Sequence, residues 1–206
     1  MKIVVLSSLA LKGALEKGKA QFEQALGAPL ELHFDATQAI LPRLTAGFRA
    51  DLVILTAEAI KGLATREVRA LGASGVGVAV KAGAPRPDIG TVDAFKRALE
   101  SASSVAHSKI GASGIYFAEL VEKLPIRLKR RIVVEKGPVG LVVARGEAEI
   151  GLQQICELEP VPGIDIVGPL PKPIQRLTHF AGGIPTNAAN PQGGSALLAR
   201  LPIIAT

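Results

Sequence analysis

Small residues with a hydroxyl group or no side chain gather in the stretch SKIGASGIYFAEL, residues 108–120, just before an apolar pattern with helical spacing. Free N–H groups at the start of a helix carry partial positive charge and bind anions. Ser113 and Gly114 lie at this boundary, and Tyr116, the one tyrosine of the chain, follows them. The stretch is therefore either a simple turn with a helix cap or an anion-binding site.

The same pattern recurs at other strand ends, where hydroxyl, amide or glycine residues precede a helix. Any one of these residues is explained as a helix cap, because Ser and Thr cap most helices. Several donors at one edge of a sheet suit an oxyanion or carboxylate that is held by neutral dipoles, with room for one cation. The residues that share this position are Ser7, Ser8, Thr37, Lys136, Gly137 and Gln154.

No motif in the chain points to a metal or a cofactor. The sequence lacks HExxH, a GxGxxG that opens a helix after a strand, GxxxxGK[ST], a GxSxG elbow and a Cys/His metal spacing. His33, His107 and His179 lie far apart in strand-like segments, and we interpret them as strand residues. The single cysteine, Cys156, excludes an intrachain disulfide and is interpreted as a buried thiol. We expect no cofactor and no metal.

Charge and hydropathy narrow the class of partner. The formal charge is +6, yet the one dense basic run, Arg127 to Arg131, has no interleaved aromatic residues and is interpreted as a solvated face. We therefore expect a small anionic ligand, no nucleic acid and no membrane insertion. Met1 and Lys2 lead straight into an apolar strand pattern, without an export signal. As given, the chain is expected in the cytoplasm, or in the periplasm if this is a mature form.

Apolar runs of strand length alternate with helical patterns, which predicts an open α/β sheet. The predicted strands are residues 2–6, 30–34, 50–56, 74–83, 104–108, 131–135, 148–154, 163–171 and 177–188. The predicted helices are residues 9–26, 38–46, 57–68, 91–102, 114–124, 136–146 and 190–201. Asp35 or Thr37 is expected to cap the second helix, and Thr91 to cap the fourth.

Two strand–helix series follow one another and are joined by two crossing strands. This predicts two lobes, the first of residues 1–78 plus 178–206 and the second of residues 79–177. Ligands of open α/β sheets bind beyond the carboxyl ends of the strands. We therefore expect a hinge at the crossing strands and a ligand cleft between the lobes.

Four segments in this order resemble a known family: VVLSSLALKGALEKGKAQFE, HFDATQAILPRLTAGFRADLVILT, GASGIYFAELVEKL and VVARGEAEIGLQQI. They are similar to class II periplasmic solute-binding proteins, most of all to the molybdate-binding branch. The resemblance implies an α/β fold of two lobes with open mixed sheets, a two-strand hinge and a central cleft. It also implies an anion bound by hydroxyls and helix-start amides, with the matching positions at Ser8, Thr37, Ser113, the turn near Lys136 and the strand end near Gln154.

Two functions remain open. The molybdate-binding branch usually has a tyrosine where Gln154 lies and lacks a lysine at Lys136, and a lysine suits a carboxylate. The first function is a solute-binding protein that captures a small anion, with an ABC transporter permease as partner if it is exported. The second is a cytoplasmic carboxylate isomerase of the aconitate isomerase type, which resembles the same branch; Lys136, Tyr116 or His107 would then move the proton. A ligand-sensing domain of a regulator is a weaker third reading, because no helix-turn-helix precedes Met1.

Overall fold

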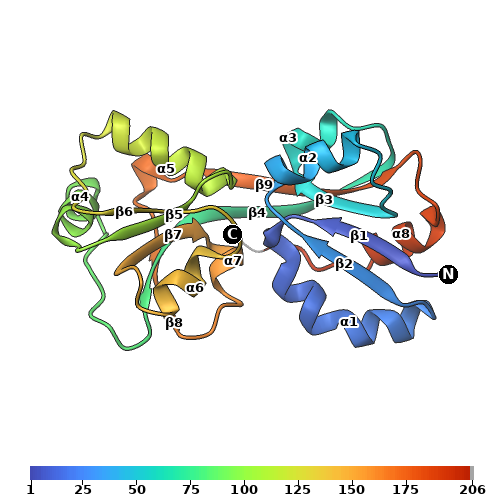
Figure 1. Ribbon diagram of the computed structural model, residues 1–206, viewed down its shortest axis with the longest axis horizontal. Coiled ribbons are helices and arrows are strands. Elements are labelled where there is room, and N and C mark those ends of the chain that lie inside the picture. The colour runs from blue at the N-terminus through green and yellow to red at the C-terminus, as the bar shows by residue number, and fades with distance from the viewer. Residues whose placement is uncertain (205–206) are drawn as a thin grey trace. The chain divides into compact units, whose positions relative to one another are not determined.

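The computed structural model describes residues 1–204 and forms two compact units (Figure 1). Unit 1 comprises Met1–Ala73 and His179–Thr206, and unit 2 comprises Ser74–Thr178. The chain therefore passes between the units at Ala73–Ser74 and at Thr178–His179. The first passage lies earlier than the lobe boundary predicted at residues 78–79, because it falls inside one long strand, β4 (Thr65–Lys81). The predicted boundary at 177–178 lies one residue from the second passage.

Unit 1 is built on a sheet in which three parallel strands are followed by one antiparallel strand. The order is β2-β1-β3-β9, with β9 antiparallel to β3. The strands are β1 (Ile3–Ser7), β2 (Leu30–Phe34), β3 (Leu52–Thr56) and β9 (Leu177–Pro185). The helical elements are η1 (Leu9–Leu11), α1 (Lys12–Leu26), α2 (Thr37–Thr45), α3 (Ala57–Lys61) and α8 (Pro191–Leu198).

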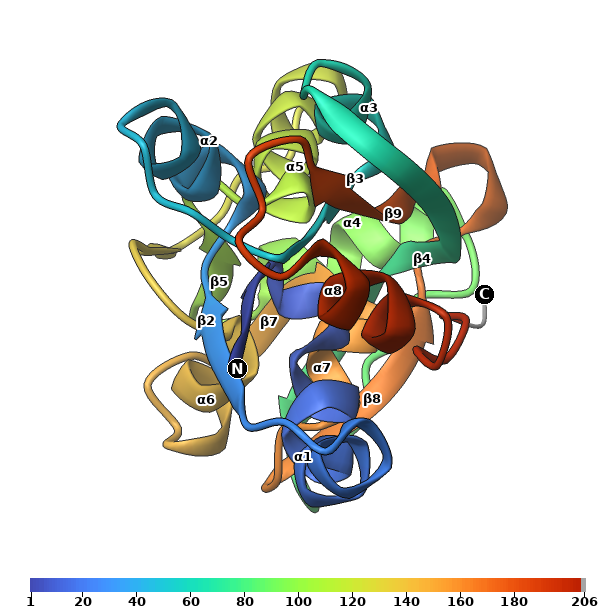
Figure 2. The same ribbon diagram turned by 90° about the vertical axis from the view of Figure 1, so that its right-hand side faces the viewer.

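Helices cover both faces of the unit 1 sheet because its strands are apolar on both sides. Ile40 of α2 and Ile60 of α3 pack with Leu6, Val53 and Leu55. On the other side α8 contacts β1, β3 and α1 (Figure 2). The central strands β1 and β3 are thus largely buried, whereas β2 at the sheet edge is partly exposed.

Unit 2 has a mixed sheet in the order β8-β4-β7-β5-β6. β5, β6 and β7 run parallel, while β4 is antiparallel to both β7 and β8. The strands besides β4 are β5 (Val105–Ser108), β6 (Arg131–Val134), β7 (Ile150–Gln154) and β8 (Ile164–Pro169). The helical elements are α4 (Val92–Ser101), α5 (Ala112–Lys123), α6 (Val139–Ala144), α7 (Ile155–Leu158) and η2 (Lys172–Ile174).

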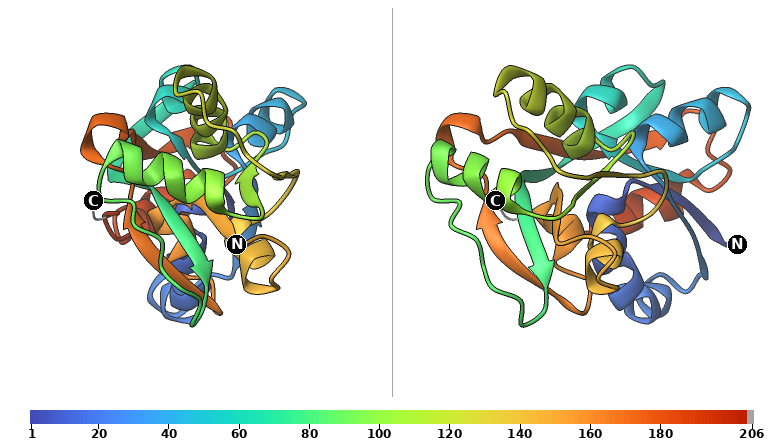
Figure 3. Two further views of the ribbon diagram at one scale, coloured as in Figure 1. Left: turned by 90° about the vertical axis from the view of Figure 1, so that its left-hand side faces the viewer. Right: turned by 60° about the vertical axis from the view of Figure 1, so that its left-hand side comes forward.

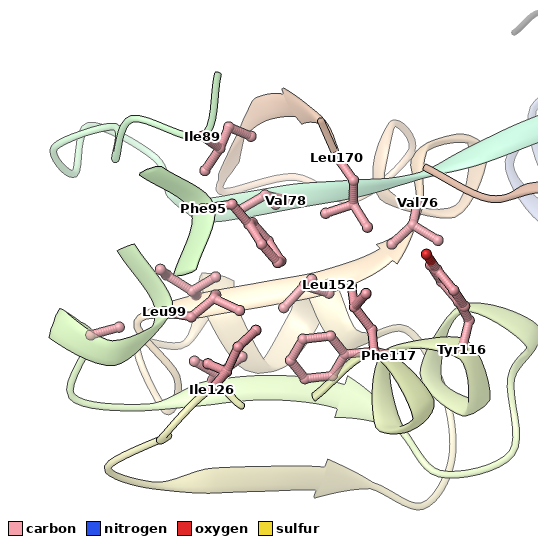
Figure 4. Packing of buried hydrophobic residues seen from close by; sticks show 14 of the residues in the cluster. Val76, Val78, Ile89, Phe95, Leu99, Tyr116, Phe117, Ile126, Leu152 and Leu170 are labelled. Atoms are coloured by element: carbon pink, nitrogen blue, oxygen red, sulfur yellow. The ribbon is translucent and has the colours of Figure 1, made fainter. Parts of the chain in front are cut away.

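The two faces of the unit 2 sheet are covered by different helices (Figure 3). Phe95 of α4 and Phe117 of α5 pack with Val78 and Leu152 of the sheet in one cluster (Figure 4). On the other face α6 packs with Ala106 and Ala148. Each large side chain buried this way stabilises the unit by about 1.5–3 kcal/mol. With few aromatic residues in the chain, most of the core is aliphatic.

The helix predicted over residues 57–68 is wrong in its second half. α3 ends at Lys61, and β4 begins at Thr65. Gly62 closes the helix, and the amide of Thr186 then donates to the carbonyl of Ala64. Residues 65–68 therefore form a strand because β4 lies beside β9 in the sheet. The local pattern of residues 62–68 does not reveal this pairing.

The helix-cap predictions had mixed outcomes. Thr91 Oγ1 accepts from Ala94 N at 3.1 Å, so the cap of α4 is confirmed. α2 is capped by Ala36 rather than by Asp35 or Thr37. Asp35 instead accepts a bond from the Ala36 amide, and Thr37 is already the first helical residue. In the described part of the chain, no helix combines the length and apolarity needed to cross a membrane.

Candidate functional site

Three parallel strands of unit 2 end at the same edge of the sheet. Ser108 of β5 is level with Val134 of β6, and His107 is level with Leu152 of β7. The segments that follow these strands therefore leave from one edge, where open α/β sheets bind ligands. They are the loop of residues 108–113, the turn at Lys136 and Gly137, and the strand end at Gln153 and Gln154.

Ser108 is enclosed by its own loop. A Cβ atom at Gly114 would lie 1.9 Å from Ser108 O, and one at Gly111 would lie 2.5 Å from Ser108 Oγ. Both positions therefore need glycine, which lets the backbone approach this closely. Within residues 1–204, Ser108 Oγ is one of two buried side-chain oxygen or nitrogen atoms without a hydrogen-bond partner. Leaving a buried hydroxyl unpaired costs about 1–3 kcal/mol, so it calls for a partner outside the chain.

Ser113 lies inside α5, not immediately before it as predicted. The helix begins at Ala112, and its N-cap is Gly111. Glycine has no side chain with which to cap the first turn, and its carbonyl accepts from the amides of Gly114 and Ile115 at 2.9 and 3.0 Å. The Ser113 side chain is buried, at 2% exposure. The structure thus places a buried hydroxyl and uncapped amides directly after Ser108.

His107 fixes the backbone of Ser108. Its Nδ1 lies 2.8 Å from Ser108 O, and Arg131 Nε donates to its Nε2 at 2.6 Å. Because a guanidinium can only donate, Nε2 is the acceptor and Nδ1 carries the proton. Burial, and then the charge of Arg131, lower the pKa of His107. A neutral imidazole with both nitrogens engaged positions Ser108 and has no free nitrogen for proton transfer.

Tyr116 is buried in the core cluster of unit 2, and its side chain extends from α5 towards Val76 of β4 (Figure 4). The hydroxyl donates to Ile174 O at 2.5 Å, and the Arg176 guanidinium lies 4.3 Å from the ring centroid. Burial raises the pKa of Tyr116. Its one proton is thus already used within unit 2.

Gln153 links two elements at the strand edge. Its Oε1 accepts from the Val139 amide at the start of α6 at 2.7 Å, and its Nε2 donates to Glu157 Oε2 of α7 at 2.6 Å. Gln153 is buried, and Glu157 is half-buried. Desolvation raises the pKa of Glu157 to about 7, although the bond from Gln153 acts in the opposite direction. The edge therefore holds a carboxyl group that changes protonation near neutral pH.

Gln154 ties the strand end to the residues at the unit boundary. Its carboxamide bonds Thr178 Oγ1 at 2.7 Å. With the amide oriented so that its oxygen accepts that bond, the nitrogen donates to Ser74 O at 2.7 Å and Gly75 O at 3.3 Å. Gln154 is thus fully bonded inside unit 2, next to both points where the chain leaves it.

Unit 1 presents a matching edge, where β1, β2 and β3 end. Ser7 Oγ donates to Ser8 O at 2.8 Å, and Ser8 N donates to Ile54 O at 2.7 Å. Ser8 Oγ is the second buried atom without a partner in the described chain. Thr37, at the start of α2, accepts from Thr56 N at 3.3 Å through its hydroxyl. Ser7, Ser8 and Thr37 therefore lie together at one strand edge.

The other candidates are a turn and a thiol. Lys136 is exposed, and Gly137 has φ +85°, which only glycine adopts readily. Desolvation raises the pKa of Cys156 to about 12, so the thiol stays protonated and is a poor nucleophile. In the part of the chain that the structure describes, no three His, Cys, Asp or Glu residues are grouped as metal ligands.

Two residues of this edge, Ser108 and Glu157, were not among the predicted site residues, and Gln153 was noted only as a polar residue at a strand end. Ser108 opens the glycine-rich stretch and directly follows a strand, so its position was a usable signal. The bond of Gln153 to Val139 was not predictable, because it depends on how α6 packs. Glu157 gave no signal at all, since its sequence neighbours are apolar or acidic and its environment is created by folding.

Comparison with known proteins gives a family and a fold. Residues 3–201 match the family model of bacterial extracellular solute-binding proteins. An aconitate isomerase from Pseudomonas sp is 38% identical over 213 residues, which cover 95% of this chain and 80% of that protein. The periplasmic molybdate-binding protein of Azotobacter vinelandii has a TM-score of 0.75 at 15% identity, with 96% of this chain and 91% of that chain covered.

A regulatory protein shares the fold as well. The regulatory domain of CcmR from Synechocystis, solved in complex with 2-PG, has a TM-score of 0.67 at 12% identity, with 98% of this chain and 99% of that chain covered. At such identities the likeness shows the fold alone, which is the two-lobe type II periplasmic-binding fold that the sequence predicted. The match along residues 3–201 goes further: this chain belongs to the family of bacterial extracellular solute-binding proteins.

Proposed function

We propose that this protein binds a small anion with several negatively charged oxygens, through hydroxyls that follow its parallel strands. One observation carries the proposal. In the chain up to residue 204, the two buried side-chain atoms without a partner are Ser8 Oγ and Ser108 Oγ. Each follows a parallel strand and precedes a helical element, one in unit 1 and one in unit 2.

The chemistry of these atoms selects an anion. A hydroxyl donates one hydrogen bond, and a bond to a charged oxygen is worth about 1.5–3 kcal/mol. The uncapped first turn of α5 adds N–H donors and the positive end of a helix dipole. We propose Ser7, Ser8 and Thr37 as ligand contacts in unit 1. In unit 2 we propose Ser108, Ser113 and Gly114, and the turn at Lys136 and Gly137. Tyr116 of α5 and Gln154 at the end of β7 already bond groups of unit 2, so they would contact a ligand only by exchanging those bonds.

A carboxylate is favoured over a metal oxyanion. The relative at 38% identity is named for a tricarboxylate, whereas the molybdate-binding structure shares 15% of its residues with this chain. Lys136 adds a cation next to the unit 2 edge, which suits a ligand with several carboxylates. If the protein is exported to the periplasm, an ABC transporter permease is its proposed partner; otherwise we place it in the cytoplasm.

A thermal-shift panel tests the proposal. It compares cis- and trans-aconitate, citrate, molybdate, tungstate, sulfate and phosphate, each at about a hundred times its dissociation constant, where a bound ligand adds about 2.7 kcal/mol. We expect tricarboxylates to raise the melting temperature. A shift with molybdate or tungstate alone would overturn the carboxylate assignment, and no shift with any anion would overturn anion binding.

Matched serine variants locate the site. Replacing Ser8 and Ser108 together by alanine should abolish the thermal shift, because both proposed donors are lost. Ser101→Ala is the control, since Ser101 is an exposed serine at the end of α4. If the double variant responds to ligands as the wild type does, the proposed contacts are wrong although anion binding itself stands.

Isomerisation of a carboxylate is the second candidate function. The aconitate isomerase relative favours it, because the identity of 38% extends over 95% of this chain. Incubating the protein with trans-aconitate and following the cis isomer by proton NMR tests this candidate. Tight binding without conversion would identify a binding protein and exclude the isomerase.

A further inference from the structure

Moving a double bond between adjacent carbon pairs of a carboxylate substrate is an acid–base reaction. A base removes a proton from the carbon beside the double bond, and the C–H electrons form the new double bond. The electrons of the old double bond take a proton at the other end, so no oxidant or reductant is needed. Such a step needs one group that can both accept and return a proton, and it works best when the pKa of that group lies near the working pH.

The three groups that the sequence offered for this role fit it poorly. His107 has both ring nitrogens in hydrogen bonds, one of them to a guanidinium. Tyr116 donates its only proton to Ile174 O. Lys136 lies exposed on the turn between β6 and α6. A different group at this edge should therefore carry the proton.

Glu157 lies where such a group is required. α7, which carries it, begins directly after Gln154 at the carboxyl end of β7. Gln153, one residue beyond the level of His107 on β5, donates to Glu157 Oε2 at 2.6 Å. The other end of the Gln153 amide is held by Val139 N, so the carboxyl group is fixed from the start of α6. The carboxyl is thus held against Gln153, at the end of β7 and beside the start of α6.

We propose that Glu157 is the catalytic acid–base of this protein, taking a proton from a substrate carbon as a carboxylate and returning it to another carbon as a carboxylic acid. The proposal rests on the isomerase candidate. The positioning residue is Gln153, whose amide nitrogen holds one carboxyl oxygen and leaves the other to exchange the proton.

The surroundings of Glu157 support both protonation states. Desolvation raises its pKa to about 7, so both forms are populated near neutral pH. The charged groups on neighbouring elements include Glu159 at the C-cap of α7, Asp165 on β8, Lys81 at the far end of β4, and Lys136 before α6. Asp165 lies near Arg86 and accepts from Gly83 N, away from the strand edge. Burial therefore dominates the titration of Glu157.

The test compares Glu157→Gln with Glu159→Gln. Glutamine keeps an oxygen that can accept from Gln153 but cannot take up a proton. Glu159 is an exposed carboxylate two residues away, so its variant is matched in charge. Three quantities are measured for both variants and the wild type: the dissociation constant for trans-aconitate, its conversion to the cis isomer, and the incorporation of deuterium from D₂O into carbon-bound positions.

We expect Glu157→Gln to lower both conversion and deuterium incorporation by at least about 100-fold, the usual contribution of a general base. Its dissociation constant should stay within about threefold of the wild type, and Glu159→Gln should behave as the wild type in all three measurements. In the wild type, kcat should fall as the pH drops below neutral, because Glu157 becomes protonated and can no longer act as a base. Glu157→Gln should lack this fall.

The outcomes separate this inference from the function on which it rests. A wild type that converts aconitate while Glu157→Gln does so equally well overturns the role of Glu157 and leaves the isomerase intact. A wild type that binds aconitate without conversion or deuterium incorporation overturns both the isomerase and Glu157. Loss of binding in Glu157→Gln would mean that the residue holds the ligand, and the catalytic assignment would be wrong.

Discussion

The strand edges of the two units carry similar donors that are held in different ways. In unit 1, Ser7 donates to the backbone of Ser8, and Thr37 of α2 accepts from the backbone of Thr56 at the end of β3. In unit 2, Ser108 is fixed by His107, which is itself bonded to Arg131. Two glycines close over Ser108 as well. The same position in the fold thus yields simple donors in unit 1 and donors tied to titratable groups in unit 2.

This difference has a physical consequence. Substituting a donor in unit 1 removes one contact and leaves its neighbours bonded to backbone. Substituting a group in unit 2 disturbs a network in which each bond orients the next, and such networks are worth more than the sum of their pairs. Changes in unit 2 should therefore alter stability and pH dependence together with binding.

The largest effect is expected from two glycines, one in each unit. Gly114→Ala would place Cβ 1.9 Å from Ser108 O, and Gly194→Ala would place it 2.1 Å from Asp51 O. Overpacking against backbone should destabilise either variant by at least about 3 kcal/mol. Urea unfolding measures this loss. The control is Gly62→Ala, whose Cβ would lie 3.6 Å from its nearest neighbour.

Ligand binding then distinguishes the two glycines. Gly114 lies in the candidate site, so the folded fraction of Gly114→Ala should bind more weakly. Gly194 lies in α8, away from the strand edge, and Gly194→Ala should keep its affinity. Equal loss of affinity in both variants would contradict the position of the site at Ser108.

The next effect concerns the two unpartnered hydroxyls. Ser108→Ala and Ser8→Ala should each weaken binding of the best anion of the thermal-shift panel by about 10- to 100-fold, the value of a hydrogen bond to a charged group. Neither should lower the stability of the unliganded protein, because an unpaired buried hydroxyl contributes nothing to it. Calorimetric titration and urea unfolding measure both quantities. A drop in unliganded stability would show that a water or chain group already pairs these atoms.

A smaller effect is expected in the pH dependence of unit 2. The pKa of His107 is lowered from 6.5, so the unfolded chain binds more protons, and stability is lost as the pH falls below 6.5. The pKa of Glu157 is raised from 4.5 to about 7, so the folded chain binds more protons, and stability is lost as the pH rises from 4.5 to about 7. The two contributions oppose one another in the wild type.

Single variants separate the contributions of His107 and Glu157 to the pH dependence of stability. In urea unfolding between about pH 5 and pH 8, His107→Gln should leave a stability that declines as the pH rises, and Glu157→Gln should leave one that increases. Ser8→Ala, from unit 1, should follow the wild type. Identical curves for the two unit 2 variants would show that these groups do not titrate as the structure indicates.

The smallest effect is expected at Tyr116. Tyr116→Phe removes the hydroxyl that donates to Ile174 O and should cost about 1 kcal/mol of stability. If that bond is kept in the complex, affinity for the anion should not change. A tenfold loss of affinity would instead support Tyr116 as a ligand contact, as the sequence suggested.

The sequence predicted the α/β alternation well because its strands are short apolar runs and its helices have apolar faces. It failed at residues 62–68, where pairing with β9 rather than local pattern creates a strand. It singled out Ser7, Ser8, Thr37 and Ser113 as candidates from their position after strands, and their role as ligand contacts stays a prediction. It did not identify Glu157, because the pKa of a carboxyl group depends on burial that only packing provides.

The order of hydroxyl and glycine residues after each strand was determined by the sequence itself, since these positions are local in the chain. Which hydroxyls stay unpaired was decided by the tertiary structure. Ser7 and Thr37 found backbone partners, while Ser8 and Ser108 did not. The reason is that a hydrogen bond requires two groups to meet at about 3 Å, and folding alone brings distant residues to that distance.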